Sequence, residues 1–270
     1  MDTATTPEDN RRRHPGHDPL PRHVLGIWAH PDDECYLSAG LMARMADAGR
    51  PVTVLTATRG EQGHSGNGGP EALDVAALRE AELRASLAVL GVGDVRLLDL
   101  RDGACILEDD ADVIATIGAV MDAVGPDVVL TFGPDGITGH PDHRMVSRWV
   151  TEAWRRSRRR PDLLYATMTD RFLADHAELH DRIGLFGEFG GRAHAVAEGD
   201  VALAALLSEA ELDRKRAALA AHGSQTRELA GLMGEEAYRR WWAAEWFRRP
   251  TGAELLRCEL VARPRAEVPA

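Results

Sequence analysis

Two short clusters of histidine and carboxylate residues carry the most distinctive chemistry in this sequence. The first is the run Ala29-His30-Pro31-Asp32-Asp33-Glu34, and the second is Gly139-His140-Pro141-Asp142-His143. Imidazole nitrogen and carboxylate oxygen both suit Zn²⁺, and a catalytic zinc typically has three protein ligands and an open position for water. His30, Asp33 and one of the later histidines meet that count. The sequence therefore predicts one mononuclear metal site.

The spacing within the first cluster gives its two aspartates different roles. Residues three apart at the start of a helix share a face, so His30 and Asp33 can converge while Asp32 points towards the reacting water. The alternative is that the acidic residues only begin a helix, where carboxylates cap free amides and complement the helix dipole. The second His-Pro-Asp element follows another predicted strand in an equivalent position, and this favours the metal site over capping alone.

Apolar runs and helical periodicities alternate through the first half of the chain. Strands are predicted over 24–29, 52–57, 95–98 and 128–132, with helices over 37–48, 73–90 and 113–124 between them. This alternation predicts an α/β fold, a Rossmann-like three-layer sandwich with a mostly parallel sheet. Ligands of such folds bind beyond the carboxyl ends of the strands, where both clusters fall. Neither a dinucleotide-binding nor a P-loop glycine motif occurs, which disfavours nucleotide binding.

Beyond about residue 160 the pattern weakens. Leu163–Met168 indicates a strand, Glu209–Ala221 a helix, and Tyr238–Phe247 an aromatic-rich helix. The aromatic side chains of this last segment either pack into the core or stack on a ligand, and core packing is the more common outcome. We expect one domain over 23–255, preceded by a disordered, polar N-terminal arm (1–22) and followed by a tail (256–270).

Composition narrows the function classes. The 270 residues are 44% hydrophobic, and 43 acidic against 32 basic residues give a net charge of −11, which disfavours nucleic acid and anionic membranes as partners. A basic run at 155–160 reads as the charged end of a helix.

We find no signal peptide and no stretch of the ~20 apolar residues that a membrane span needs. Three widely separated cysteines (Cys35, Cys105, Cys258) predict neither disulfides nor a thiolate zinc site. A cytoplasmic location is expected.

The two clusters together resemble the signatures of the LmbE-like (PIG-L) superfamily of zinc-dependent N-acetylglucosaminyl deacetylases. The resemblance continues through Arg79-Glu80-Ala81-Glu82, which looks like the R-x-x-E helix of that family, and through Asp99–Gly103. Lys215 and His222-Gly223-Ser224-Gln225 are similar to its K…H-x-S-Q signature. The similarity extends over roughly residues 22 to 250.

This resemblance implies a set of site residues. His30, Asp33 and His143 would ligate Zn²⁺, and Asp32 would be the general base that deprotonates the attacking water. Because histidine and carboxylate ligands suit Fe²⁺ as well, iron stays possible.

Two further pairs of residues are implied by the same resemblance. His140, held in its cationic form by Asp142, would stabilise the oxyanion and help protonate the leaving amine. Arg79 and Asp102 would contact the sugar.

The expected reaction is removal of acetyl from an N-acetylglucosamine moiety of a small molecule, releasing acetate and a free amine. One alternative is an amidase acting on a thiol conjugate of the mycothiol type, with a larger acyl group. Another is an inactive carbohydrate-binding or regulatory homologue. The glycine-rich loop from Gly60 to Pro70 is either a substrate lid or a surface loop.

Overall fold

The computed structural model describes residues 20–63, 74–187 and 194–260. Most of the expected N-terminal arm, and residues 64–70 of the glycine-rich loop, lie outside this part of the chain.

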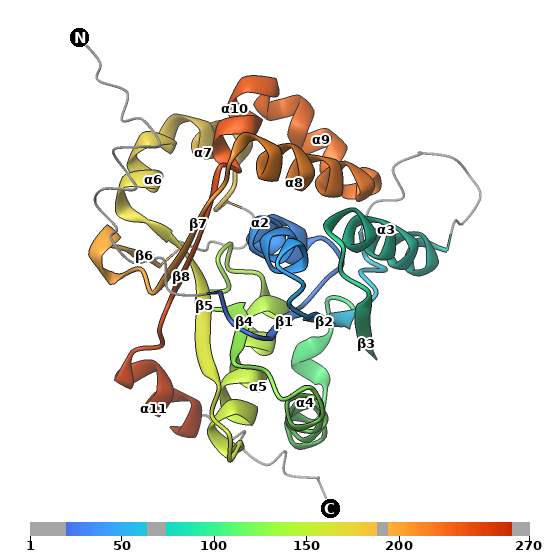
Figure 1. Cartoon of the computed structure of the whole chain (residues 1–270). Coiled ribbons are helices and arrows are strands. Elements are labelled where there is room, and N and C mark those ends of the chain that lie inside the picture. The colour runs from blue at the N-terminus through green and yellow to red at the C-terminus, as the bar shows by residue number, and fades with distance from the viewer. Residues whose placement is uncertain (1–19, 64–73, 188–193, 261–270) are drawn as a thin grey trace, which may run out of the picture.

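Strand β1 lies in the middle of a mostly parallel sheet with the order β3-β2-β1-β4-β5-β8-β7, and β6 pairs with β5 outside this path (Figure 1). The strands are β1 (Val24–Trp28), β2 (Val52–Thr58), β3 (Asp94–Leu100), β4 (Val128–Phe132), β5 (Asp162–Thr169), β6 (Ala195–Val196), β7 (Leu203–Leu206) and β8 (Ala244–Arg248).

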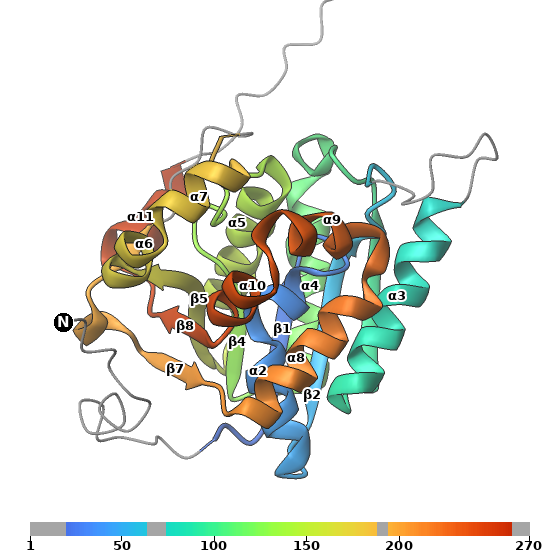
Figure 2. The same ribbon diagram turned by 90° about the horizontal axis from the view of Figure 1, so that it is seen from above.

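Helices cover both faces of the sheet, so the predicted three-layer α/β sandwich is confirmed (Figures 1 and 2). One layer holds α2 (Asp33–Asp47), α3 (Val75–Leu90), α8 (Glu209–Ala221), α9 (Gly223–Met233) and α10 (Glu235–Trp241). The other holds α4 (Asp110–Val124), α5 (Pro141–Arg156) and α11 (Gly252–Leu260), while α6 (Asp170–Asp175) and α7 (Ala177–Ile183) follow β5. Helix α11 runs across the expected domain end at residue 255. Among the described helices, none is long and apolar enough to cross a membrane.

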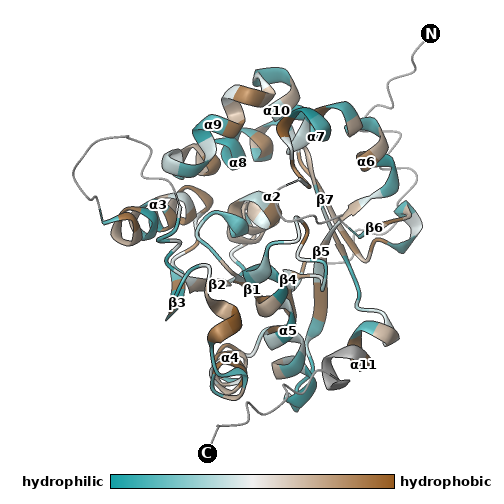
Figure 3. Cartoon of the chain, turned by 180° about the vertical axis from the view of Figure 1, so that it is seen from behind, coloured by the Kyte–Doolittle hydropathy of each residue, from teal (hydrophilic) through white to brown (hydrophobic). Residues whose placement is uncertain are grey.

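The central strands are buried on both faces, as the apolar runs predicted. Every residue of β1, β2 and β4 is buried, which is typical of parallel strands covered by helices on both sides. Figure 3 shows the hydrophobic residues concentrated on the central strands and on α4, with hydrophilic residues on the outer turns of α3 and α9. Beneath the site, the rings of Trp28 and Phe132 meet edge to face with centroids 5.2 Å apart.

The strand order places the two clusters together. From β1 the chain moves outward to β2 and β3, and then crosses back to β4 on the other side of β1. The loop after β1 therefore leads to α2 on one face, and the loop after β4 leads to α5 on the opposite face. In open α/β sheets, ligands bind at the carboxyl ends of the two strands on either side of such a reversal.

The predicted aromatic helix over Tyr238–Phe247 is wrong in its second half. Helix α10 ends at Trp241, and Ala244–Arg248 form β8, which pairs antiparallel with both β5 and β7. In β8 the buried residues Glu245 and Phe247 alternate with half-buried Trp246, a period of two that suits a strand. Aromatic residues fit this pleated environment well, and pairing on both sides satisfies the backbone. By contrast, the helix predicted over Glu209–Ala221 is confirmed to the residue.

Helix α2 is held in place by a buried ion pair. Lys215 of α8 is fully buried, and its Nζ donates to the Tyr36 carbonyl and to Glu245 Oε1, each at 2.8 Å. The Glu245 carboxylate also accepts the backbone N–H groups of Gly40 at 2.7 Å and Leu41 at 2.9 Å, in the middle of α2. A regular helix would direct the Gly40 N–H to the Tyr36 carbonyl, which here receives the lysine. The ion pair thus anchors α2 to α8 and β8 through its own backbone.

We expect Lys215→Met to lower the free energy of unfolding by about 3–5 kcal/mol, because it leaves the Glu245 carboxylate buried without its cation. The double variant Lys215→Met/Glu245→Gln removes that charge and should recover part of the loss. Urea denaturation of the three proteins measures this difference. Arg240→Met is a control on an exposed cation that pairs with exposed Glu236. A loss in Lys215→Met no larger than in this control would contradict the anchoring role.

Candidate metal centre

The first cluster forms the turn between β1 and α2, and its backbone is unusual. Asp32 is the N-cap residue of α2 and has φ 115° and ψ −29°, a left-handed conformation that L-residues seldom adopt and that costs about 1–3 kcal/mol. Within the described structure its side chain makes no capping hydrogen bond to the helix. Capping therefore does not explain the carboxylate at Asp32. Asp33 Oδ2 instead accepts the His30 backbone N–H at 2.8 Å, which folds the turn back on itself.

The second cluster begins α5. His140 is the N-cap residue, and Pro141 occupies the first helical position, where its missing N–H and fixed φ suit a helix start. The Asp142 backbone N–H donates to His140 Nδ1 at 3.1 Å. This bond makes Nδ1 an acceptor, so in neutral His140 the ring proton is on Nε2.

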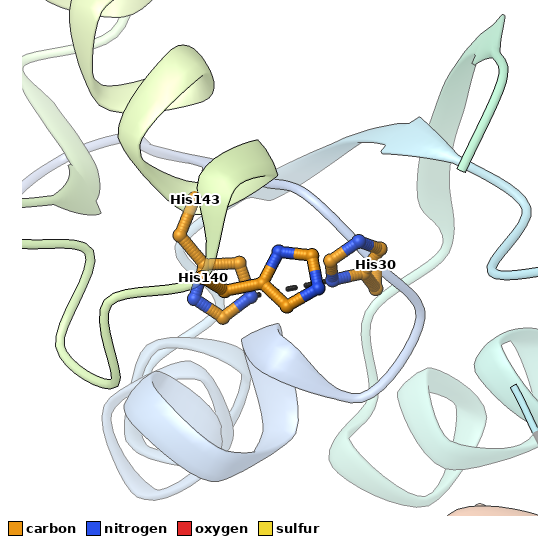
Figure 4. Close-up of side chains that lie close together, drawn as sticks. All are labelled: His30, His140 and His143. Atoms are coloured by element: carbon orange, nitrogen blue, oxygen red, sulfur yellow. Dashed lines mark hydrogen bonds between the residues drawn. The ribbon is translucent and has the colours of Figure 1, made fainter. Parts of the chain in front are cut away.

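The three predicted ligands come together at the carboxyl ends of β1 and β4. His30 Nδ1 lies 3.2 Å from His143 Nε2 and 3.6 Å from Asp33 Oδ2, and His143 Nε2 lies 3.4 Å from Asp33 Oδ1. Ligands about 2.0 Å from a tetrahedral zinc would be about 3.3 Å apart, which is close to each of these three separations, although the two Asp33 distances involve different carboxylate oxygens. Donor atoms of His30, His140 and His143 also lie within 4.8 Å of one another (Figure 4).

Hydrogen bonds behind the two ligand histidines direct their lone pairs at each other. His143 Nδ1 donates to the Gly136 carbonyl at 3.0 Å, which leaves Nε2 as the lone-pair nitrogen. His30 Nε2 faces Asp102 Oδ1 at 3.0 Å and Asp142 Oδ2 at 3.3 Å, so Nε2 carries a proton, and in neutral His30 the lone pair is on Nδ1. Carboxylate–histidine pairs of this kind orient metal ligands in many proteins. Two lone pairs and a carboxylate converge on a point that only a cation or a proton can satisfy.

The pKa values of the histidines follow this arrangement. Although burial alone lowers it, hydrogen bonding to Asp102 and Asp142 raises the pKa of His30 to about 10. Burial and the neighbouring His30 lower the pKa of His143 to about 3 and that of His140 to about 4. Asp142 raises the pKa of His140, but too little to offset these effects. The low pKa of His140 opposes the cationic form expected from the sequence.

Comparison with known proteins places this site in a family. The family model "GlcNAc-PI de-N-acetylase" (PIG-L) matches residues 25–154. A 1D-myo-inositol 2-acetamido-2-deoxy-alpha-D-glucopyranoside deacetylase of Rhodococcus opacus is 34% identical over 243 residues, covering 76% of this chain and 82% of that protein. The chain belongs to the PIG-L family. The resemblance carried by its two clusters is thus confirmed.

Two other proteins match the chain over a shorter stretch or in fold alone. A probable N-acetyl-alpha-D-glucosaminyl L-malate deacetylase 2 of Bacillus anthracis is 34% identical over 134 residues, which cover 49% of this chain and 59% of that protein. The structure of an N,N'-diacetylchitobiose deacetylase from Pyrococcus horikoshii superposes with a TM-score of 0.55 at 20% identity, covering 94% of this chain and 95% of that one. By their names, these three relatives are deacetylases.

Arg79 and Asp102, expected to contact a sugar, lie at the site but face protein groups. The Arg79 guanidinium is buried and donates to the carbonyls of Pro31 and Gly60 at 2.6 and 2.9 Å and to Asp32 Oδ2 at 3.1 Å. A Cβ at Gly60 would lie 2.2 Å from this guanidinium, so the close approach requires glycine. Asp102 is buried as well and supports His30. Burial raises the pKa of Asp32 to about 7, while Arg79 opposes this effect.

Sequence reasoning missed two supports of the site. Glu34 was read only as an acidic residue at a helix start, yet it is fully buried, and its Oε1 lies 2.9 Å from Nε2 of the equally buried His222. Burial lowers the pKa of His222 and Glu34 raises it, with a net rise. The Asp142 carboxylate is held by the backbone N–H groups of Gly103 at 2.7 Å and Cys105 at 3.3 Å. The family signature around His222 was the available signal for the first support, and none pointed to the second.

The donor geometry predicts which residues hold a metal. Asp33→Ala and His143→Ala should each lower the metal bound per chain by at least about tenfold after dialysis, since each removes one of three ligands. His140→Ala should keep the metal content of the unchanged protein, because His140 Nδ1 is engaged at the helix start. Plasma emission spectrometry of the purified variants measures this. Loss of metal from His140→Ala with retention in Asp33→Ala would favour the three histidines as the ligand set.

Proposed function

We propose that the protein is a metal-dependent N-deacetylase that removes acetyl from an N-acetylglucosamine moiety of a small-molecule glycoside, releasing acetate and a free amine. The observation that carries the proposal is the convergence of His30 Nδ1, His143 Nε2 and the Asp33 carboxylate beside the strained Asp32. A site of this kind suits hydrolysis of an amide. Membership of the PIG-L family supports an amino sugar as the substrate.

His30, Asp33 and His143 would hold the metal, either Zn²⁺ or Fe²⁺. When bound, the metal would acidify a water and polarise the acetamide carbonyl. Asp32 is adjacent in sequence to the ligand Asp33 but is not part of the donor set, so its carboxylate remains available as the general base for the attacking water. The same carboxylate, once protonated, can return the proton to the leaving amine, which removes the need for a cationic histidine.

His140 would stabilise the oxyanion as a neutral donor. Its Nδ1 accepts the Asp142 N–H, so the proton on Nε2 is the one available to a negatively charged oxygen. A preorganised neutral N–H is sufficient for this purpose, since backbone amides perform the same task in many hydrolases. Asp142 and Asp102 would accept from His30 Nε2 and fix the orientation of this metal ligand. Arg79 would orient the Asp32 carboxylate by donating to its Oδ2.

The substrate belongs to the class that the names of the relatives give. The Rhodococcus protein is named for an inositol glycoside of N-acetylglucosamine, and the Bacillus protein for a malate glycoside. We infer a glycoside of the same kind for this chain, with the sugar shared and the aglycone distinguishing the members. A cytoplasmic location would fit such a substrate.

A panel of N-acetylglucosaminides tests the reaction. The zinc-loaded protein should release acetate and one primary amine from the inositol or the malate glycoside. Asp32→Asn should lower kcat by about 10²–10⁴-fold with metal content retained, because it removes the general base. Asp47→Asn, at the exposed far end of α2, is the matched control. Absence of amine release from every glycoside, or full activity of Asp32→Asn, would contradict the proposal.

The neutral form of His140 makes a separate prediction. His140→Ala should lower kcat by about 10²–10³-fold, as loss of one oxyanion donor does. His140→Gln places an amide N–H near the former Nε2 and cannot become cationic, so it should keep kcat within about tenfold of the unchanged protein. Steady-state kinetics of the two variants measure the difference. Equal losses in both would favour a cationic histidine.

A further inference from the structure

The peptide group between Pro31 and Asp32 is held at both ends by buried, charged side chains. Its carbonyl oxygen accepts from Arg79 Nη2 at 2.6 Å, and its N–H donates to Glu34 Oε2 at 3.0 Å. Arg79 belongs to α3 and Glu34 to the first turn of α2, so the two groups approach the peptide from different elements. The orientation of this peptide plane sets φ of Asp32, the residue with the left-handed conformation.

The charges on either side oppose reversal of this peptide. A flip would rotate ψ of Pro31 and φ of Asp32 together, and it would relieve the positive φ of Asp32. The flipped peptide, however, would turn its carbonyl oxygen towards the Glu34 carboxylate and its N–H towards the Arg79 guanidinium. Both contacts would be repulsive among buried groups, where electrostatic interactions are strong. The clamp therefore selects one orientation of the Pro31–Asp32 peptide.

Glu34 depends in turn on His222. Both side chains have a relative exposure of 0%, and the Glu34 Oε1 to His222 Nε2 distance is 2.9 Å. His222 joins the end of α8 to the start of α9, so the histidine comes from the far half of the sequence. Without it, one oxygen of a fully buried carboxylate would lose its partner, and Glu34 would move to find another. The position of Glu34 opposite the Asp32 N–H thus requires His222.

We propose that Glu34, backed by His222, and Arg79 form a peptide clamp that aims the Asp32 carboxylate at the reacting water. This inference rests on the proposed hydrolase function. Glu34 and His222 are positioning residues, which act on the general base through its backbone and do not touch substrate or metal. Arg79 contributes twice, because it also donates to Asp32 Oδ2 at 3.1 Å.

The first test does not depend on activity. Amides at the start of a helix have no intrahelical acceptor and usually exchange rapidly with solvent. Because Glu34 accepts the Asp32 N–H, that amide should exchange at least about 100-fold more slowly than an unprotected one in the unchanged protein, as measured by NMR. In His222→Leu it should exchange at least about tenfold faster, while the amides of Gly40 and Leu41 stay protected. A rapidly exchanging Asp32 amide in the unchanged protein would overturn the clamp.

The second test separates positioning from folding. Gln places its amide nitrogen near the site of histidine Nε2, whereas Asn stops short of it. His222→Gln should keep kcat within about threefold, and His222→Asn and His222→Leu should lower it by about 10–100-fold, with KM and bound metal nearly unchanged. The control is His180→Leu, which removes another buried histidine whose Nε2 accepts from Trp241 Nε1 at 2.9 Å. It should destabilise the protein without lowering kcat.

The outcomes are distinguishable from failure of the proposed function. If the unchanged protein releases no amine, the hydrolase proposal fails, and the exchange of the Asp32 amide still decides whether the clamp exists. If the protein is active and His222→Asn and His222→Leu turn over as fast as His222→Gln, the positioning role is overturned. Equal losses of kcat in His222→Leu and His180→Leu would overturn it as well, since both would then reflect general destabilisation.

Discussion

The whole site depends on one electrostatic constraint, namely that one nitrogen of each of two imidazoles and a carboxylate face each other within 3.6 Å. Such an arrangement is unfavourable without a cation or a proton, so other hydrogen bonds must hold the three side chains in place. Asp102 and Asp142 accept from His30 Nε2, and the Gly136 carbonyl accepts from His143 Nδ1. The Asp33 carboxylate accepts the His30 backbone N–H. Each ligand is therefore fixed by a hydrogen bond on the side away from the metal position, which is how metal sites are preorganised.

This constraint extends into helix α2, which begins at the site. Its first turn carries Asp33 and Glu34, and its middle is anchored through the Gly40 and Leu41 amides to the Glu245–Lys215 pair. Buried ion pairs contribute little net stability compared with apolar packing, because desolvation offsets most of the attraction. Their directionality is the more useful property here. An apolar contact would permit α2 to slide or rotate, whereas charged groups bound to specific amides fix its position along its own axis.

The sequence predicted the structure best where the pattern of neighbouring residues alone determines a helix or a strand. Apolar runs and helical periodicity located the strands and helices of the parallel half, and the position of both clusters after strands predicted the site at the sheet's carboxyl edge. Tyr238–Phe247 was misread because aromatic spacing fits a helix or a strand, and the choice was made by pairing of β8 with β5 and β7. The family signature marked Lys215 and His222, but local patterns could not identify their partners, which lie 30 and 188 residues away in the sequence.

The family model covers residues 25–154, yet side chains that contact the two strand-to-helix turns come from outside this stretch. The proposed ligands and Asp32 lie in the matched part, on those two turns. The peptide that orients Asp32 needs His222, and the helix that carries Asp33 needs Lys215 and Glu245. Under the proposed function, the C-terminal part contributes buried charged groups, namely His222, Lys215 and Glu245, which hold the Pro31–Asp32 peptide and helix α2 in place.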